Sequence, residues 1–322
     1  MKQVRHTIRI LLISLSASPC HAVGWDLQSK TLPRPDGSAI HYYVERGDGE
    51  VQQSLLVIMQ GSDCNSIARH PTIHEYAEAA PEHAVLLVEK YGITKELSPS
   101  VDVDRVDCPV EYLRNDNLEQ RVLDYLAVIA VLRAEADWWM GELVILAGSS
   151  GVNVAEQVAA LVPETQRLVI FGFGSRWLED DILYGVRASL EAANLEDDAR
   201  MLEFNSAIST LREIRENPTP NKFASGHSYW GWASLLRFDQ LEALARVLVP
   251  VLAIQGLQDQ NVSPKGAQEL IKALHELGRA NITYREYDDL DHGFRDSSGK
   301  SHKSRVVEDI RRWLQSPRAV NR

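Results

Sequence analysis

Apolar segments alternate with segments of helical periodicity along most of this chain, and this alternation constrains the fold more than any other feature. Apolar runs stand at 54–61, 84–92, 142–148, 167–174 and 249–256. Helical spacing is found at 65–80, 117–136, 151–163, 264–278 and 304–314, and less apolar strands are expected at 39–47 and 281–289. Strands that are apolar throughout are buried on both faces, so they favour a parallel sheet covered by helices. The alternation therefore predicts a doubly wound α/β domain with a mostly parallel sheet.

One segment interrupts the alternation. Residues 175–247 lie between two predicted sheet strands, have helical periodicity and contain no convincing strand. The segment is far longer than an ordinary connection in an α/β domain. We expect a helical cap over the carboxyl edge of the sheet, with a bend at Pro218 and Pro220. The core domain would then consist of residues 23–174 and 248–322.

The first 22 residues have the pattern of a secretory signal peptide. Lys2, Arg5 and Arg9 give a positive start, residues 10–15 are apolar, and Ala22 is a small residue before a cleavage point. A short membrane anchor is the alternative, but the apolar run is well under the ~20 residues that span a bilayer. We expect cleavage and export to the periplasm or beyond, and no membrane span in the mature chain.

The charge of the chain argues against two classes of partner. Loss of the first 22 residues would change the formal net charge from −11 to −14, because three cations and no acids would leave. An acidic protein has no electrostatic reason to bind nucleic acid or an anionic membrane surface. The sequence makes no prediction about the oligomeric state.

The cysteines predict one disulfide. Cys20 lies in the signal pattern, which leaves Cys64 and Cys108 as an even pair in a chain expected to reach an oxidising compartment. Two buried free thiols are the alternative. No Cys-x-x-Cys motif or Cys/His cluster indicates a metal site. His70 and His74 are four residues apart, but the glutamate that directly follows the first histidine of a zinc-protease signature is missing.

A turn of small residues follows the apolar run at 142–148. Residues 147–151 read Ala-Gly-Ser-Ser-Gly, a small-x-Ser-x-small pattern centred on Ser149; centring it on Ser150 would give Val152 a flanking position. A sharp strand-to-helix turn is cramped, so the residues around a nucleophile there must be small. Ser149 is therefore the predicted nucleophile, and the Ser150 N–H, at a helix start, a predicted oxyanion donor. A turn of this composition could also bind phosphate or have no role.

An acid and a base follow in the sequence. Asp259 stands shortly after the run at 249–256, and His292 lies in the loop beyond the strand at 281–289. Separately, each has a simpler explanation, since Asp is common in turns and a loop histidine is often solvated. The order Ser149, Asp259, His292, with each residue after a predicted strand, resembles the α/β-hydrolase superfamily.

The resemblance extends to the loop after the run at 54–61. Many members have His-Gly here, where this chain has Gln60-Gly61. The resemblance implies that the Ser62 N–H, or alternatively that of Gly61, is the second oxyanion donor. If Cys64 bonds Cys108, the bridge would fix this loop, and such donors work by being fixed before charge develops.

The resemblance covers the chain from about Gly24 to the last helix, apart from the cap segment. The sequences Asp-x-Asp-His-Gly-Phe and Ile-x-Gly-x-x-Asp-x-x-Val are closest in style to the dienelactone hydrolase and prolyl-oligopeptidase branches. It implies a serine hydrolase that needs no metal or organic cofactor: Ser149 attacks a carbonyl, His292 transfers the proton, and Asp259 holds the imidazole in its working tautomer. The expected partner is a small-molecule or short-peptide acyl substrate, and ester, thioester and peptide all stay open.

The cap segment contains the candidate substrate contacts. Tyr229, Trp230 and Trp232, near His227, would line an acyl or aromatic pocket, or would instead pack the cap against the core. Two other functions stay open: a non-catalytic binding protein on the same fold and an acyltransferase with the same triad. The presence of all three triad residue types argues against the first.

Overall fold

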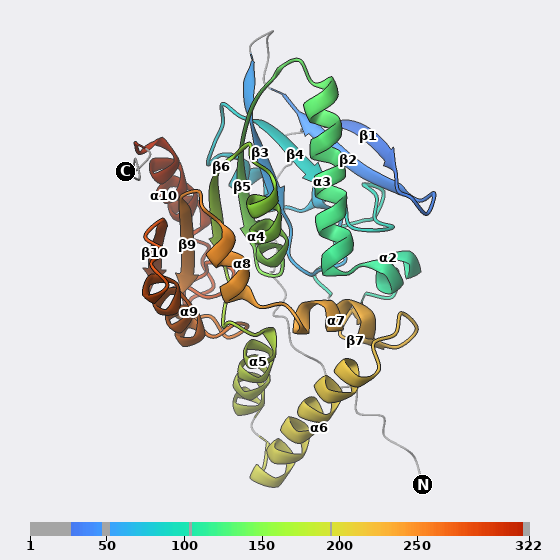
Figure 1. The fold of residues 1–322 in the computed structure, drawn as a ribbon. Helices are drawn as coiled ribbons and strands as arrows, with labels where there is room; N and C mark the ends of the chain where they lie inside the picture. The colour runs from blue at the N-terminus through green and yellow to red at the C-terminus, as the bar shows by residue number, and fades with distance from the viewer. Residues whose placement is uncertain (1–26, 47–51, 103–104, 194, 318–322) are drawn as a thin grey trace.

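Eight strands form one sheet in the order β1-β2-β4-β3-β5-β6-β9-β10 (Figure 1). This computed structural model describes residues 27–46, 52–102, 105–193 and 195–317, so the signal pattern and Cys20 lie outside the described residues. The strands are β1 (Gln28–Pro33), β2 (Ala39–Glu45), β3 (Gln53–Met59), β4 (Ala84–Val88), β5 (Trp139–Gly148), β6 (Thr165–Phe171), β9 (Val251–Gly256) and β10 (Ile282–Tyr287). The β1–β2 and β2–β4 pairs are antiparallel. All pairs from β4 to β10 are parallel, which confirms the predicted sheet.

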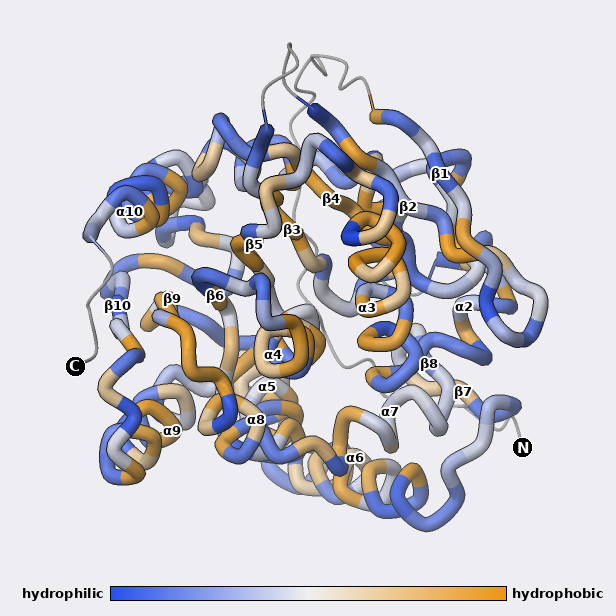
Figure 2. Tube along the Cα trace, turned by 45° about the horizontal axis from the view of Figure 1, so that its top comes forward, coloured by the Kyte–Doolittle hydropathy of each residue, from blue (hydrophilic) through white to orange (hydrophobic). Residues whose placement is uncertain are grey.

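Helices cover both faces of the sheet. Helices α3 (Leu118–Glu135), α4 (Gly151–Leu161), α8 (Gln240–Arg246) and α9 (Pro264–Glu276) contribute to the core on one face. Helices η1 (Ile67–Arg69), α1 (Ile73–Ala77) and α10 (Lys303–Gln315) contribute to the core on the other. Leu55 and Val57 of β3 face the first core, and Leu56 and Ile58 face the second. Both faces of the central strands are buried, and this explains the runs of consecutive apolar residues in β3 and β5, which are largely orange in Figure 2.

One strand and one helix of the core domain were not predicted from the sequence. β1 is a polar edge strand whose side chains are largely exposed, so it has no apolar pattern to mark it. Helix α2 (Val110–Asn115) has only six residues, of which Tyr112 alone is buried. Both lie where tertiary packing, rather than local periodicity, decides the conformation.

The segment 175–247 is mainly helical, as expected. It contains α5 (Leu178–Ala192), α6 (Asp197–Glu216), α7 (Tyr229–Leu236) and α8, and Figure 1 shows the first three gathered beyond one end of the sheet. Ile182, Leu211 and Trp232 belong to an apolar cluster that these three helices share. The two prolines noted above lie in the connection after α6.

Two details of this segment correct the prediction. The strands β7 (Phe223–Ala224) and β8 (His227–Ser228) form a small antiparallel hairpin where no strand was expected. Two residues per strand are too few to show a period. Helix α8 packs with α4 and α9, and its Leu244 is part of the core beside the sheet. The end of the 175–247 segment therefore adds to the core domain.

Candidate active site

The turn between β5 and α4 places the backbone strain on Ser149. Its φ is 53°, whereas Ser150 has an ordinary helical φ of −61° as the N-cap of α4. The Ser149 N–H donates to the Phe171 carbonyl oxygen over 3.0 Å. A left-handed conformation costs a non-glycine residue about 1–3 kcal/mol and persists only where the surroundings impose it. The small-x-Ser-x-small pattern therefore corresponds to a strained turn centred on Ser149.

Close backbone approaches explain the glycines around this turn. A Cβ atom on Gly151 would lie 2.6 Å from the Met59 carbonyl oxygen and 2.7 Å from that of Gln60. A Cβ atom on Gly61 would lie 3.2 Å from the Cβ of Ser149. The end of β3 and the strained turn thus lie against each other, which brings the loop carrying Ser62 next to Ser149.

His292 and Asp259 form a hydrogen-bonded pair. Nδ1 of His292 lies 2.7 Å from Oδ2 of the fully buried Asp259. The same oxygen accepts a hydrogen bond from Nε2 of Gln255 at 3.0 Å. Oδ1 accepts from the N–H groups of Asn261 at 2.8 Å and Val262 at 3.0 Å. The carboxylate is therefore held from several sides, and it fixes the histidine tautomer with the proton on Nδ1 and Nε2 free to act as a base.

The imidazole of His292 lies against Gly172, the residue that follows β6. Gly172 has a φ of 60°, and a Cβ atom there would lie 2.9 Å from Cε1 of His292. Because β6 pairs directly with β5, this position is next to the turn that carries Ser149. Burial lowers the pKa of His292, but the negative charge of Asp259 and its hydrogen bond outweigh the burial and raise that pKa above its ordinary value.

A cavity of about 90 Å³ opens at this edge of the sheet. Ser62, Ser149 and Ser150 contribute to its wall. The apolar lining comes from the core and the cap together: Phe173, Leu178, Ile182, Trp232, Leu235 and Phe238. Polar side chains also line it, namely Asn153, Arg176, Asp181, Gln240 and Asn261. Apolar walls with a limited number of polar groups are typical of a site for a small ligand.

Only one of the three aromatic candidates lines this cavity. Trp232 does so, and its indole N–H donates to the Ala224 carbonyl oxygen at 2.7 Å. Tyr229 is buried elsewhere in the cap, with its hydroxyl 3.3 Å from Glu213, and the side chain of Trp230 is exposed. Tyr229 and Trp230 do not line this cavity, because the orientation of α7 presents Trp232 to it; the burial of Tyr229 within the cap agrees with the alternative of a packing role. His227 is also buried, against the rings of Tyr112 and Trp232.

Asp181 is a cavity residue that the sequence did not indicate. This buried carboxylate accepts hydrogen bonds from the Ser175 N–H at 2.8 Å, the Ser175 hydroxyl at 3.0 Å and the Ser263 N–H at 2.9 Å. Burial raises its pKa to about 6, against the lowering effect of these donors. The neighbouring Glu179 forms an ion pair with Arg215 of α6. Asp181 lies in the first turn of a helix, where acidic residues are common, so nothing in the sequence distinguishes it.

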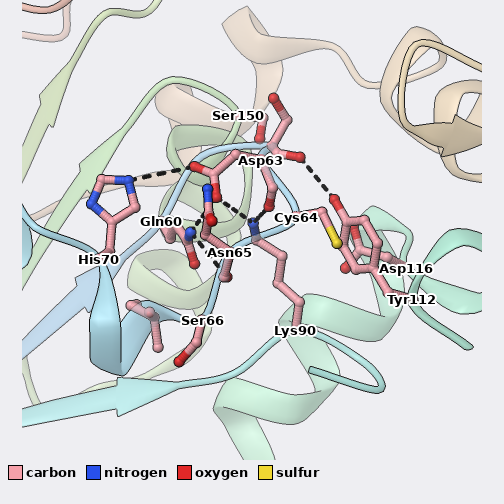
Figure 3. Close-up of polar contacts among 12 residues, drawn as sticks. Gln60, Asp63, Cys64, Asn65, Ser66, His70, Lys90, Tyr112, Asp116 and Ser150 are labelled. Carbon is pink, nitrogen blue, oxygen red and sulfur yellow. Dashed lines mark hydrogen bonds and ion pairs between the residues drawn. The ribbon is translucent and has the colours of Figure 1, made fainter. Parts of the chain in front are cut away.

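The loop of residues Gln60–Asn65 follows β3 and is here called the oxyanion loop, after the role that the sequence resemblance implies for it. Cys64 and Cys108 form a disulfide that anchors it, as the cysteine pair predicts. The Ser62 carbonyl oxygen accepts a hydrogen bond from the hydroxyl of the buried Tyr112 at 2.8 Å. His70 lies 3.6 Å from Asp63 of this loop. Figure 3 shows these side chains converging on the loop.

Two kinds of feature are absent from the described residues. In that part of the chain, no group of three or more His, Cys, Asp or Glu side chains is arranged to hold a metal ion. None of the helices described has the length and apolarity needed to cross a membrane.

Comparisons with known proteins agree with this architecture. Residues 198–317 match the model of the prolyl oligopeptidase family. A puromycin-hydrolyzing peptidase from Mycobacterium tuberculosis is similar with a TM-score of 0.56 at 19% identity, over 88% of this chain. An acylaminoacyl peptidase in complex with a chloromethyl ketone is similar with a TM-score of 0.61 at 12% identity, over 90% of this chain. Est1E from Butyrivibrio proteoclasticus, with ferulic acid bound, is similar with a TM-score of 0.58 at 15% identity, over 87% of this chain and 95% of Est1E.

The prolyl oligopeptidase match covers less than half of the 322-residue chain, and these solved structures are at most 19% identical to it. The structural neighbours show that the chain has the α/β-hydrolase fold. The chain spans only 38% of the puromycin-hydrolyzing peptidase and 41% of the acylaminoacyl peptidase, so it corresponds to a part of each. No curated protein matches it in sequence.

Proposed function

We propose that this protein is an exported serine hydrolase that cleaves an ester, thioester or peptide-type acyl bond through Ser149, His292 and Asp259. One observation carries the proposal. His292, whose Nδ1 lies 2.7 Å from Oδ2 of Asp259, packs against Gly172 beside the strained turn of Ser149, and Ser149 lines the cavity described above.

The proposed reaction begins with an acyl-enzyme. Nε2 of His292 takes the Ser149 hydroxyl proton while Oγ forms a bond to the substrate carbonyl carbon, and the carbonyl oxygen becomes an oxyanion. The leaving group then departs with the proton from His292. Water repeats the sequence: His292 takes a proton from water, the hydroxide attacks the acyl carbon, and Ser149 regains its proton as the acid leaves. Asp259 keeps the imidazole in the required tautomer and stabilises its cation.

The oxyanion would be stabilised by two backbone N–H groups, those of Ser62 and Ser150. Both residues line the cavity, and the Ser150 N–H stands at the N-terminus of α4. Donors at a helix start carry a partial positive charge, so they stabilise negative charge that develops beside them. Ser62 belongs to the loop after β3, and Ser150 belongs to the turn after β5. These two segments pack closely because Gly61 and Gly151 have no side chains.

The lining of the cavity indicates the kind of acyl group. Its walls are apolar apart from the serines and a few polar side chains, and Arg176, which also lines it, is paired with Asp239. A small aliphatic or aromatic acyl group without charge fits this lining, and Est1E was solved with a small aromatic acid, ferulic acid. The disulfide and the signal pattern of residues 1–22 support export.

Trapping of the acyl-enzyme tests this proposal. The exported protein is mixed with p-nitrophenyl esters of short aliphatic and aromatic acids, quenched in acid and analysed by intact mass. A burst of p-nitrophenol and the mass of one added acyl group on wild type, both absent in a folded Ser149→Ala variant, are the expected results. Turnover by the Ser149→Ala variant at the wild-type rate would rule out the assigned nucleophile.

A further inference from the structure

The oxyanion loop is held by buried side chains that have no part in the reaction proposed above. Three long polar side chains donate hydrogen bonds to the carbonyl oxygens of Gln60, Ser62 and Asp63 in this loop. These donors are Arg121 of α3, Tyr112 of α2 and Lys90, which follows β4. All three are at most 7% exposed.

Arg121 and Tyr112 fix the two peptide groups that flank the Ser62 N–H. The Arg121 guanidinium donates to the Gln60 carbonyl oxygen at 2.5 Å, and the Tyr112 hydroxyl donates to the Ser62 carbonyl oxygen at 2.8 Å. The peptide group that carries the Ser62 N–H lies between them. Since peptide groups are planar, holding the neighbours on both sides restricts the direction of this N–H. Arg121 also lies 3.5 Å from the Ser150 hydroxyl, so it contacts both donor segments.

Lys90 holds the next peptide group of the loop. Its ammonium group donates to the Asp63 carbonyl oxygen and lies 3.9 Å from the Asp63 carboxylate. Figure 3 shows this side chain extending to the loop, and its nitrogen lies 5.7 Å from the centre of the Tyr112 ring. Burial lowers the pKa of Lys90 to about 8, although the negative charge of Asp63 opposes this.

Further contacts fix the loop from within and from its far end, and His227 forms a hydrogen bond with the Ser62 backbone. Nε2 of Gln60 donates to Oδ1 of Asp63 at 2.6 Å and to the Asn65 carbonyl oxygen at 3.2 Å. Arg105 donates to the Cys64 carbonyl oxygen at 3.0 Å. The desolvation of buried charges can cost more free energy than their pairing returns, so their presence is weak evidence for a stabilising role. A role in fixing geometry accounts for them better.

We propose that Tyr112, Lys90 and Arg121 are positioning residues that keep the Ser62 N–H directed at the developing oxyanion. This inference rests on the serine hydrolase function proposed above. A donor displaced by about 1 Å can cost on the order of 100-fold in rate, even when the substrate still binds. Loss of one tether should therefore lower kcat and leave KM nearly unchanged.

The test uses Tyr112→Phe, which removes one hydroxyl and keeps the ring. Its matched control is Tyr125→Phe, because the buried Tyr125 hydroxyl also donates to a backbone carbonyl of this region, that of Ile58 in β3, at 3.3 Å. Both variants, and Lys90→Met as a second loop variant, are assayed for thermal stability, for kcat and KM on a p-nitrophenyl ester, and for the rate of inactivation by a fluorophosphonate.

We expect Tyr112→Phe to lower kcat and the inactivation rate constant by about 10-fold, and Lys90→Met by about 100-fold, with KM within about twofold of wild type. Tyr125→Phe should react like wild type. Wild-type kinetics in folded Tyr112→Phe and Lys90→Met, or equal losses in the Tyr125→Phe control, would overturn the inference. Failure of wild type to react with either reagent would instead overturn the serine hydrolase function.

Discussion

Gly172 and His292 are packed so closely that a single methyl group on Gly172 would lie 2.9 Å from Cε1 of the imidazole. Real Cβ contacts are not this short. Any side chain at residue 172 would therefore force the imidazole of His292 to move. The absence of a side chain at residue 172 is what lets the imidazole occupy the edge of the sheet beside Ser149.

The first prediction concerns Gly172→Ala. The methyl group should displace His292, and kcat/KM should fall by about 100-fold, because misplacement of a catalytic group by about 1 Å has this effect. Gly141→Ala is the matched control: Gly141 also has a positive φ, of 79°, but no atom within 4 Å of its would-be Cβ. Both variants should lose about 1–2 kcal/mol of stability from backbone strain, and only Gly172→Ala should lose activity. Equal activities in the two variants would contradict this placement of His292.

The second prediction concerns pH. His292 must be neutral to accept the Ser149 proton, and the charge of Asp259 raises its pKa above the ordinary value of 6.5 despite the opposing effect of burial. Because the pKa of His292 is raised, the imidazole becomes protonated, and so inactive as a base, at a higher pH than a free histidine would. The kcat/KM of wild type should therefore fall tenfold per pH unit below an inflection that lies above pH 6.5. A profile that stays flat down to pH 5 would exclude His292 as the base.

The third prediction separates two buried carboxylates at the same edge of the sheet. Asp259→Asn should lower kcat by about three to four orders of magnitude, because an amide favours the wrong histidine tautomer. Asp181→Asn should retain far more activity, since the partners of Asp181 are Ser175 and the Ser263 N–H rather than His292. Steady-state kinetics of the two variants on one ester decides between them. The opposite order of activities would assign the role of triad acid to Asp181.

A fourth prediction concerns the cavity wall. Trp232 lines the cavity, whereas Trp230, two residues away on the same helix, is exposed. Trp232→Ala should lower kcat/KM for aromatic acyl esters by about 10-fold or more relative to acetyl esters, because the aromatic group loses its apolar contact. Trp230→Ala should leave the ratio unchanged. A similar ratio in both variants would mean that the acyl group binds elsewhere.

The fifth prediction concerns the disulfide. The bridge closes a loop with a sequence separation of 44. The double variant Cys64→Ser, Cys108→Ser should therefore lose about 2–4 kcal/mol in free energy of unfolding. Because Cys64 lies in the oxyanion loop, kcat of the folded variant should fall as well. Urea unfolding and ester kinetics measure the two effects separately, and unchanged values in both would show that the bridge contributes neither stability nor loop geometry.

Chain order was enough to predict that Asp259 and His292 lie together, as their 2.7 Å contact shows. Ser149, Asp259 and His292 each follow a predicted strand, and parallel strands bring their carboxyl ends to the same edge of the sheet. The assignment of Ser149 to the same triad stays a prediction. The disulfide between Cys64 and Cys108 was also predictable, because the chain has three cysteines and Cys20 lies in the signal pattern. These inferences needed only local patterns and one topological rule.

The surroundings of the site could not be predicted in this way. Tyr112, Lys90 and Arg121 come from three elements, and no spacing in the sequence shows that they converge on one loop. The choice of Trp232 over Trp230 depends on how α7 is rotated against the cap, which is a property of packing. Strand β1 was missed because an exposed edge strand needs no apolar pattern.

Labelling with a fluorophosphonate, followed by peptide mapping, tests the central claim most directly. Wild type, Ser149→Ala and Ser150→Ala are treated at equal concentration after each is shown to be folded. The account predicts a single modified site, Ser149, in wild type and in Ser150→Ala, and no modification in Ser149→Ala. Modification of Ser150, or of any residue in the Ser149→Ala variant, would contradict it.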